Sequence, residues 1–245
     1  MLLLDFDGTL SPIVSRPSGA VLPGKVKDEL EKFATRYPAA VISGRGLKDV
    51  RRKVGIRGLA YAGSHGLVWQ IGGRISRVLV TGQTAKNLAH IKKKLRHLPR
   101  VFPGVILENK DFGLAVHYRM LAAGKAAALK SFVSKEILPH MSGIRIQKGK
   151  KVVEFLPDTD WNKGKCALVL WKFFEKKTKR RLAPLYIGDD ATDESAFAAL
   201  KRGVTVRVGR SARSGAEYFI KDSSRPRGLI ALLNKLGPDF QKQRE

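Results

Sequence analysis

LLLDFDGTL, residues 2–10, is the stretch around which we expect the fold to be organised. Its leading leucines form a short apolar run of the kind that is typical of a strand buried on both faces of a parallel sheet. Asp5 and Asp7 follow, and because strand side chains alternate, both carboxylates can point the same way while Phe6 turns into the core. Gly8 then allows a sharp bend and close approach to a ligand. Ligands of open α/β sheets bind at the carboxyl ends of strands, so this stretch predicts a reactive or binding site.

Length and composition indicate an ordinary globular chain with an unusual charge. The 245 residues can form one large domain or two small ones, and 43% of them are hydrophobic. There are 47 Lys and Arg residues against 21 Asp and Glu residues, which gives a formal net charge of +26. Such a charge attracts phosphorylated ligands or nucleic acid. Because the basic residues fall in scattered clusters without a recognised nucleic-acid-binding motif, we do not expect nucleic acid as the primary ligand.

The sequence also bears on location and on cysteine chemistry. No apolar run approaches the length of a transmembrane helix, and the first expected strand starts at residue 2, so we expect neither a membrane span nor a signal peptide. The expectation that follows is a cytoplasmic protein without membrane association. Cys166 is the only cysteine, which excludes an internal disulfide and cannot by itself hold a structural zinc ion. Its apolar neighbours indicate an inert position in a core helix.

Two further apolar runs end in polar residues. Residues 39–42 lead into Ser43-Gly44-Arg45, and residues 185–187 lead into a segment that begins Gly188-Asp189-Asp190. A hydroxyl at a strand end, before a glycine and a new helix, is well placed to bind an anion. Ser43 could instead cap that helix, and the two roles are compatible.

His65 lies between two glycines in residues 63–66. A histidine on flexible backbone, rather than on an apolar helix face, slightly favours a functional role over a core role. Residues 67–71 and 74–80 then predict a β-hairpin that turns at Gly72-Gly73.

From about residue 82 to residue 157 the pattern changes. An apolar helical stripe from Leu88 to Leu98 and another from Leu129 to Ile137 each precede a pair of strand-like runs, at 105–109 and 112–118 and then at 144–147 and 151–156. This order, α-β-β-α-β-β, predicts an antiparallel sheet with helices on one face. We therefore expect an inserted α+β domain at 82–157 within an α/β core formed by 1–81 and 158–245.

The polar residues at the strand ends, together with Lys163 at the start of an expected helix, form a set suited to phosphoryl transfer. Asp5 is the better nucleophile because it lies on the strand side of the turn, and it would become an acyl phosphate. Asp7 would give a proton to the departing alkoxide and later take one from water. Carboxylates that face a phosphate need a cation, and Mg²⁺ held by Asp5, Asp189 and the carbonyl oxygen of Asp7 would supply it. Lys163 and Ser43 would bind the equatorial phosphoryl oxygens.

Each of these features also has an ordinary structural explanation. The Asp-x-Asp pair could form a turn, Lys163 could be a solvated charge, and Gly188-Asp189-Asp190 could be an Asx-turn that begins a helix. Their occurrence in this order, each after an apolar strand or at the start of a helix, favours the catalytic interpretation.

A wider set of motifs runs from the first strand to the final helix. It consists of Asp5-Phe6-Asp7-Gly8-Thr9, Ser43-Gly44-Arg45, Gly63-Ser64-His65-Gly66, Glu108-Asn109-Lys110, His117-x-Arg119, Asn162-Lys163-Gly164 and Gly188-Asp189-Asp190-x-Thr192-Asp193-Glu194. The set resembles the motifs of the haloacid dehalogenase-like phosphohydrolases, and within that superfamily it is similar to those of the trehalose-6-phosphate phosphatases. The resemblance implies a Rossmann-like parallel-sheet core with an inserted α/β cap domain. It also implies a Mg²⁺-dependent phosphatase that releases trehalose and phosphate.

The resemblance further implies a role for individual residues. Catalytic roles go to Asp5, Asp7, Ser43 and Lys163, metal binding to Asp5, Asp7 and Asp189, and support of the metal and the lysine to Asp190 and Asp193. Sugar contacts go to Glu108, Lys110 and Glu154, which could otherwise be solvent-facing residues of an exposed sheet. The further substrate-binding candidates are Arg45 and His65. Linkers near Gly82 and Pro157 would serve as hinges for closure of the cap.

Several functional alternatives stay open at this level. The expected ligand is a small sugar phosphate, with trehalose 6-phosphate as the leading candidate. A sucrose-phosphate or mannosyl-3-phosphoglycerate phosphatase is the alternative enzyme interpretation. A basic nucleic-acid-binding protein on a phosphatase scaffold is the interpretation without enzyme activity. The sequence does not fix the oligomeric state, for which a monomer is the simplest expectation.

Overall fold

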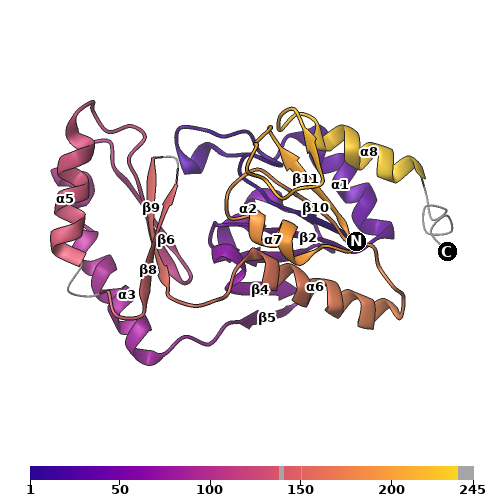
Figure 1. Cartoon of the computed structure of the whole chain (residues 1–245), viewed down its shortest axis with the longest axis horizontal. Helices are drawn as coiled ribbons and strands as arrows, with labels where there is room; N and C mark the ends of the chain where they lie inside the picture. Colours follow the sequence, from indigo (N-terminus) through magenta and orange to yellow (C-terminus); the bar gives the residue numbers. More distant parts are fainter. Residues whose placement is uncertain (138–140, 150, 237–245) are drawn as a thin grey trace. The chain divides into compact units, whose positions relative to one another are not determined.

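The computed structural model describes residues 1–137, 141–149 and 151–236. It divides into two units, one formed by Met1–Ser76 with the chain from Trp161 onward, the other by Arg77–Asp160 (Figure 1). The expected turn at Lys150 and the expected helix ends near Pro139 and at Gly237-Pro238 lie outside the described residues.

A largely parallel sheet forms the centre of the first unit (Figure 1). In the part of the chain that the structure describes, it has eight strands in the order β12-β11-β10-β1-β2-β3-β4-β5. Neighbouring strands are parallel from β12 to β3, and β4 is antiparallel to β3. This arrangement confirms the predicted fold class. The strands are β1 (Leu2–Leu4), β2 (Ala39–Ile42), β3 (Ala60–Gly63), β4 (Val68–Ile71), β5 (Arg74–Arg77), β10 (Leu185–Gly188), β11 (Val204–Val208) and β12 (Tyr218–Ile220).

The predicted hairpin is shorter than expected. Strand β5 ends at Arg77, whereas the sequence suggested a strand up to Val80. The apolar run beyond Arg77 misled the prediction, because Leu79 is 90% exposed and packs against no sheet.

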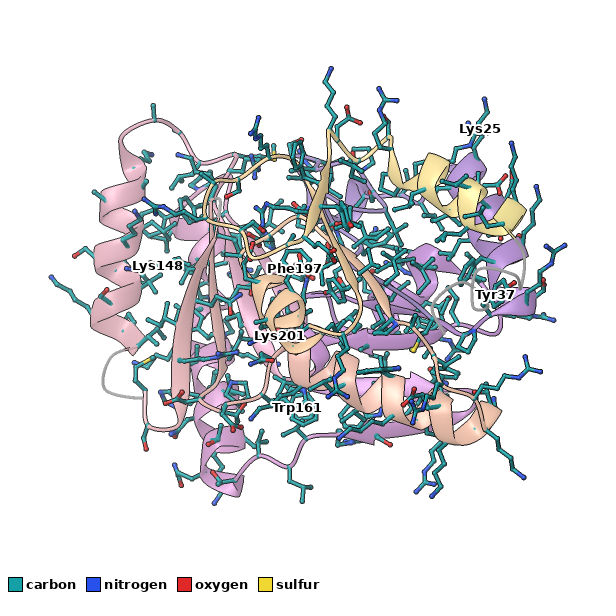
Figure 2. All side chains as sticks on the ribbon, turned by 45° about the vertical axis from the view of Figure 1, so that its right-hand side comes forward. Lys25, Tyr37, Lys148, Trp161, Phe197 and Lys201 are labelled. Atoms are coloured by element: carbon teal, nitrogen blue, oxygen red, sulfur yellow. The ribbon has the colours of Figure 1, made fainter. Side chains whose placement is uncertain are left out.

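The helices of the first unit pack through apolar stripes. In α1 (Gly24–Arg36), Val26, Leu30 and Phe33 recur at helical spacing and are buried, while Lys25 points outward (Figure 2). Helix α8 begins at Pro226, and a proline at the first helical position loses no hydrogen bond. The helices are α1, α2 (Leu47–Val54), α6 (Lys163–Thr178), α7 (Glu194–Ala199) and α8 (Pro226–Leu236), with short 3-10 turns at Pro17–Gly19 and Ser64–Gly66.

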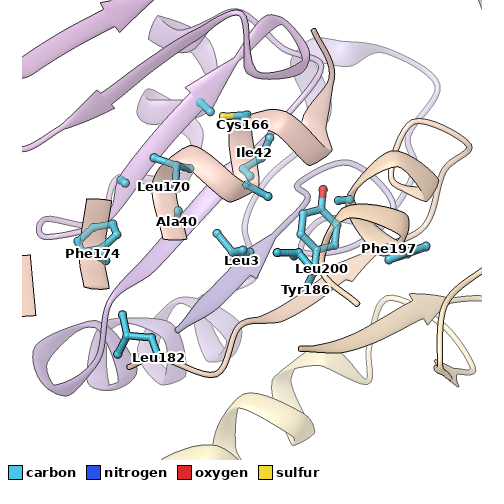
Figure 3. Close-up of a cluster of buried hydrophobic side chains, with 14 residues drawn as sticks. Leu3, Ala40, Ile42, Cys166, Leu170, Phe174, Leu182, Tyr186, Phe197 and Leu200 are labelled. Carbon is cyan, nitrogen blue, oxygen red and sulfur yellow. The ribbon is translucent and has the colours of Figure 1, made fainter. Parts of the chain in front are cut away.

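Helix α6 lies against one face of the sheet (Figure 3). Leu170 and Phe174 of this helix pack with Leu3 of β1 and Ile42 of β2 in one buried apolar cluster. Cys166 belongs to the same cluster, and burial raises the pKa of its thiol, so the predicted core position of this cysteine is confirmed. This packing fixes the first turn of α6, which carries Lys163, relative to the strand ends.

The order of the strands explains where a site forms. From β1 the chain moves to β2 and β3 on one side, whereas β10, β11 and β12 follow one another on the other side. The strand order therefore reverses between β1 and β10, and ligands of such sheets bind at the carboxyl ends of the strands at that point. The backbone N–H of Asp5 donates to the carbonyl of Ile187 at 2.9 Å, so the two strands stay paired up to their polar ends.

The second unit is an antiparallel sheet with helices on one face. Within its described residues, the strand order is β6-β7-β9-β8, and Leu114, Val116 and Phe155 face the helices together with Leu88 and Leu129. Alternate strand residues face the other way. The elements are α3 (Gly82–Leu95), α4 (Leu98–Val101), β6 (Ile106–Lys110), β7 (Gly113–His117), α5 (Lys125–Ile137), β8 (Ile144–Gly149) and β9 (Val152–Pro157). Apart from the one-turn α4, this is the predicted α-β-β-α-β-β order.

Candidate active site

Lys163 connects the two acidic strand ends of the first unit. It is the first residue of α6 and is 3% exposed, and Asn162 caps this helix by accepting the N–H of Lys165 at 3.0 Å. The ammonium of Lys163 donates to Asp5 Oδ1 at 2.7 Å and to Asp193 Oδ1 at 2.7 Å. Three segments far apart in the sequence therefore meet at one buried ammonium group.

Asp193 accepts hydrogen bonds at both of its oxygens. Oδ1 accepts from Lys163 and from the hydroxyl of Tyr186, which lies at 2.7 Å, and burial raises the pKa of that hydroxyl. Oδ2 accepts the backbone N–H groups of Asp189 at 3.1 Å and Asp190 at 3.0 Å. This carboxylate is fully buried, so it holds Lys163 and the loop after β10 in place.

Gly8 brings the turn after β1 against Asp189. Its backbone has a φ of +87°, a conformation that favours glycine, and a Cβ atom at this position would overlap the carboxylate of Asp189. The hydroxyl of Thr9 donates to Asp189 Oδ1 at 3.4 Å. Asp5 and Asp189, which the sequence places at separate strand ends, therefore belong to one site.

Burial and like charge decide how these groups hold protons. Burial raises the pKa of Asp5 well above its usual range, against the opposing charge of Lys163. Burial and the charge of Asp193 raise the pKa of Asp189 to about 6. Burial alone would lower the pKa of Lys163, but the carboxylates of Asp193 and Asp5 outweigh it and raise the pKa. The ammonium stays charged, while Asp5 and Asp189 need a further positive charge to stay ionised together.

The acidic cluster fits a hard divalent cation. Among the described residues, Asp5, Asp189 and Asp193 each offer a carboxylate oxygen, and these atoms lie within 4.8 Å of one another. Oxygen donors with excess negative charge are the ligands that Mg²⁺ prefers. Because both oxygens of Asp193 already accept hydrogen bonds, Asp5 and Asp189 are the better candidates for direct coordination.

The side chain of Asp7 binds Arg45. The Nε of Arg45 donates to Asp7 Oδ2 and its Nη2 donates to Asp7 Oδ1, both at 2.7 Å. Arg45 also donates to Asp49 Oδ2 at 2.8 Å and to the carbonyl of Pro17 at 2.9 Å. The sequence suggested Arg45 as a substrate-binding residue, and the structure adds a contact with the proposed acid-base residue.

Ser43 and His65 lie in two adjoining turns. The Oγ of Ser43 accepts the backbone N–H of Arg45 at 3.2 Å, and the backbone N–H of His65 donates to the carbonyl of Ser43 at 3.0 Å. A Cβ atom at Gly44 would come within 2.8 Å of the His65 ring, so glycine permits this approach. Ser64 and His65 both have positive φ, which is rare for residues other than glycine and marks a strained turn.

The expected sugar-contact residues lie on the second unit. Glu108 and Glu154 share a row across β6, β7 and β9, since each pairs in register with Ala115, and alternation places that row on the sheet face away from the helices. Glu108 Oε2 lies 2.8 Å from His117 Nε2, and Lys110 forms a buried ion pair with Glu154. These polar side chains hold one another in place.

The structure thus groups most of the predicted residues in three sets, while Ser43 and His65 lie in the two adjoining turns described above. Asp5, Lys163, Asp189 and Asp193 are in direct contact, Asp7 is joined to Arg45, and the sugar-contact candidates are paired on the second unit. Tyr186 and Asp49 were missed. Tyr186 was expected only as a buried strand residue. Asp49 could have been found, because an acidic residue four positions after an arginine near the start of a helix indicates a possible ion pair.

The described helices contain none long and apolar enough to cross a membrane.

Solved structures show the same fold. A trehalose-6-phosphate phosphatase related protein superposes with a TM-score of 0.81 at 23% identity, with 99% of both chains covered. The C-terminal domain of a Candida albicans trehalose-6-phosphate phosphatase gives a TM-score of 0.76 at 22% identity, with 96% of this chain and 92% of that one covered. A haloacid dehalogenase-like hydrolase from Bacteroides thetaiotaomicron gives 0.64 at 14% identity, over 95% and 98% of the chains.

Sequence comparison gives the family. A trehalose-phosphate phosphatase of Mycobacterium tuberculosis is 37% identical over 227 residues, which cover 91% of this chain and 58% of that protein. An uncharacterised glycosyl hydrolase of the same species is 38% identical over 98% of this chain and 18% of its own length. The chain therefore spans little more than half the length of the curated phosphatases it matches. The profile of the trehalose-phosphatase family matches residues 3–225, and the chain belongs to that family.

Proposed function

We propose that this chain hydrolyses trehalose 6-phosphate to trehalose and inorganic phosphate. The observation that carries the proposal is the 2.7 Å contact of Lys163 with Asp5 at the point where the strand order reverses. An ammonium group beside a buried carboxylate favours the ionised form, which a nucleophile requires. Membership of the family and the name of the curated relatives support the choice of substrate.

The proposed reaction has two half-reactions. In the first, Asp5 attacks phosphorus, the bond between phosphorus and the sugar oxygen breaks, and Asp7 gives that oxygen a proton. In the second, Asp7 takes a proton from water, whose oxygen attacks phosphorus and breaks the bond to Asp5. Lys163 and Ser43 bind phosphoryl oxygens. The Oγ of Ser43 accepts one N–H, and among the described residues its hydroxyl is not found to donate a hydrogen bond, so it is available to donate to the phosphoryl group.

We further propose that Asp5 and Asp189, with the carbonyl oxygen of Asp7, hold Mg²⁺. When bound, this ion would supply the positive charge that the buried carboxylates and a phosphate need. The raised pKa values of Asp5 and Asp189 are consistent with this assignment, since burial and, after it, the neighbouring carboxylates disfavour the ionised forms that a cation would stabilise. Asp193 and Asp190 would support the arrangement, Asp193 through its hold on Lys163 and on the loop after β10.

For the sugar we propose Glu108, Lys110 and Glu154 as hydrogen-bonding partners. Carboxylates and ammonium groups are suited to sugar hydroxyls, and the ion pair of Lys110 with Glu154 fixes both side chains before a ligand binds. His117 lies at hydrogen-bond distance from Glu108 and would hold it in the same way. His65 remains a proposed substrate-binding residue of the first unit.

Phosphate release from a panel of sugar phosphates tests the proposal. With Mg²⁺ present we expect turnover of trehalose 6-phosphate to exceed that of sucrose 6-phosphate and mannosyl-3-phosphoglycerate. Chelation of divalent ions should abolish it. Asp5→Asn should reduce kcat by more than about 10³-fold, because it removes the nucleophile. Asp28→Asn, at an exposed position of α1, is the matched control and should leave the rate unchanged.

Two other outcomes would contradict the proposal, one its substrate and one its reaction. A preference for sucrose 6-phosphate or mannosyl-3-phosphoglycerate would refute the substrate while keeping the reaction. If the wild type turned over no ester, and salt-sensitive binding of nucleic acid survived Asp5→Asn, the phosphatase proposal would fail.

A further inference from the structure

The contact between Arg45 and Asp7 goes beyond the roles assigned above. Arg45 follows β2 and is buried, with 5% of its surface exposed, whereas the side chain of Asp7 is 42% exposed. Two parallel N–H···O bonds of 2.7 Å join them. A guanidinium group that binds both oxygens of a carboxylate fixes its position and its plane, which a single hydrogen bond cannot do.

Arg45 is itself held on every side. Asp49 of α2 accepts its Nη1 at 2.8 Å, and the carbonyl of Pro17 accepts its Nη2 at 2.9 Å. The guanidinium carbon lies 5.5 Å from the centre of the Phe6 ring. Four N–H groups of the guanidinium thus donate to groups of the first unit. A side chain anchored in this way cannot move to a ligand without breaking several charge-assisted bonds.

We infer that Arg45 is a positioning residue for Asp7, and that it acts by orienting this carboxyl group rather than by binding the substrate. The inference rests on the proposed function. The two parallel bonds fix the position and the plane of the Asp7 carboxyl group. In the proposed reaction an oxygen of Asp7 must meet the leaving sugar oxygen in the first half-reaction and a water molecule in the second. Arg45 therefore orients Asp7 for these proton transfers.

Pre-steady-state kinetics with p-nitrophenyl phosphate tests this role, because nitrophenolate leaves without needing a proton. Arg45→Gln should still release a burst of nitrophenolate equal to the enzyme concentration, since Asp5 remains able to attack. The later steady rate should fall roughly 10- to 100-fold, because water attack lacks an oriented base. With trehalose 6-phosphate, kcat should fall by a similar factor while KM changes less than about threefold.

Two further variants separate positioning from structure. Arg45→Lys keeps the charge but cannot form two parallel bonds, so it should behave like Arg45→Gln. Asp49→Asn loosens Arg45 from its other side and should give a weaker effect of the same kind. Arg52→Gln is the matched control, because Arg52 pairs with the same Asp49 at 2.7 Å and does not touch Asp7, so its kinetics should equal those of the wild type. Thermal melting checks that each variant is folded.

The outcomes that would overturn the inference are distinct. If Arg45→Gln raises KM and leaves kcat unchanged, Arg45 binds substrate instead. If Arg45→Lys restores the wild-type steady rate, charge alone suffices and orientation is irrelevant. Should Arg45→Gln fail to fold, an Asp49→Asn variant with an unchanged steady rate would overturn the inference. If the wild type turns over neither ester, the proposed function fails and the inference fails with it.

Discussion

Asp189 illustrates what burial does to a single carboxylate. Its pKa rises from the ordinary 3.8 to about 6, because it is buried beside Asp193. The folded protein therefore binds a proton at Asp189 more tightly than the unfolded chain does. The stability that this proton contributes is complete below the ordinary pKa and is lost as the pH rises through the folded value.

We therefore predict that the metal-free protein loses stability between about pH 4 and pH 6.5, and that Asp189→Asn removes part of this loss. The difference between the two proteins should reach on the order of 1–3 kcal/mol at neutral pH. Urea unfolding at several pH values in the presence of a chelator measures it. Asp28→Asn, exposed on α1, is the control and should follow the wild type. Parallel curves for the wild type and Asp189→Asn would contradict the prediction.

The site residues show which features could be predicted from the sequence and which could not. Asp5, Lys163 and Asp189 could be predicted, because each is a charged residue at a strand end or a helix start. The role of Tyr186 could not, because a tyrosine in a buried strand is ordinary core material, and only the fold shows its hydroxyl 2.7 Å from Asp193. The pairing of Asp7 with Arg45 was missed for a related reason: which atoms of two polar neighbours meet depends on side-chain angles that no spacing encodes.

At the scale of elements, the close approach of α6 and α7 sets the position of Lys163. Gly164, the second residue of α6, donates its N–H to Ser195 Oγ at 3.2 Å. A Cβ atom at Gly164 would overlap the backbone carbonyl of Ser195, which cannot move without shifting α7. Asp193, the residue before α7, accepts a hydrogen bond from the ammonium group of Lys163. The glycine therefore determines how closely the lysine and its anchor approach.

We predict that Gly164→Ala destabilises the protein by roughly 1–3 kcal/mol, in the range of overpacked cores. It should also lower kcat, since α6 carries Lys163. Thermal unfolding and phosphate release measure the two effects. Gly24→Ala is the matched control, because Gly24 is the first residue of α1 and has open space around its Cα. A variant that is as stable and active as the wild type would show that the helices tolerate the methyl group.

Elements were predicted to different extents for physical reasons. The strands β1, β2 and β10 are short apolar runs that end in polar residues, so both their existence and their ends could be inferred. Strand β12 was missed, because Tyr218 and Phe219 are 54% and 57% exposed and show no alternation that would mark an edge strand. The pairing of β10 with β1 likewise follows from the topology and not from any local signal.

At the scale of the whole molecule, the charge is the feature that the site alone does not explain. The formal net charge is +26. Figure 2 shows nitrogen-tipped side chains projecting from many elements. In the described residues Lys172, Lys176 and Lys177 of α6 are exposed and form no ion pair. Such a charge produces a long-range attraction for a phosphate ester that carries two negative charges.

The excess charge should therefore accelerate encounter with the substrate. We predict that kcat/KM for the sugar phosphate falls several-fold between about 10 mM and 300 mM salt at constant Mg²⁺, because the screening length shrinks from roughly 30 Å to below 10 Å. The kcat value should change little, since the buried contacts of Lys163 are screened much less.

Replacing Lys172, Lys176 and Lys177 together by glutamine should flatten the salt dependence, and replacing them by arginine should not. These lysines lie towards the far end of α6 from Lys163. If their charge affects kcat/KM but not kcat, the effect is therefore a long-range attraction of the substrate. A salt dependence equal in all three proteins would instead assign it to charges within the site.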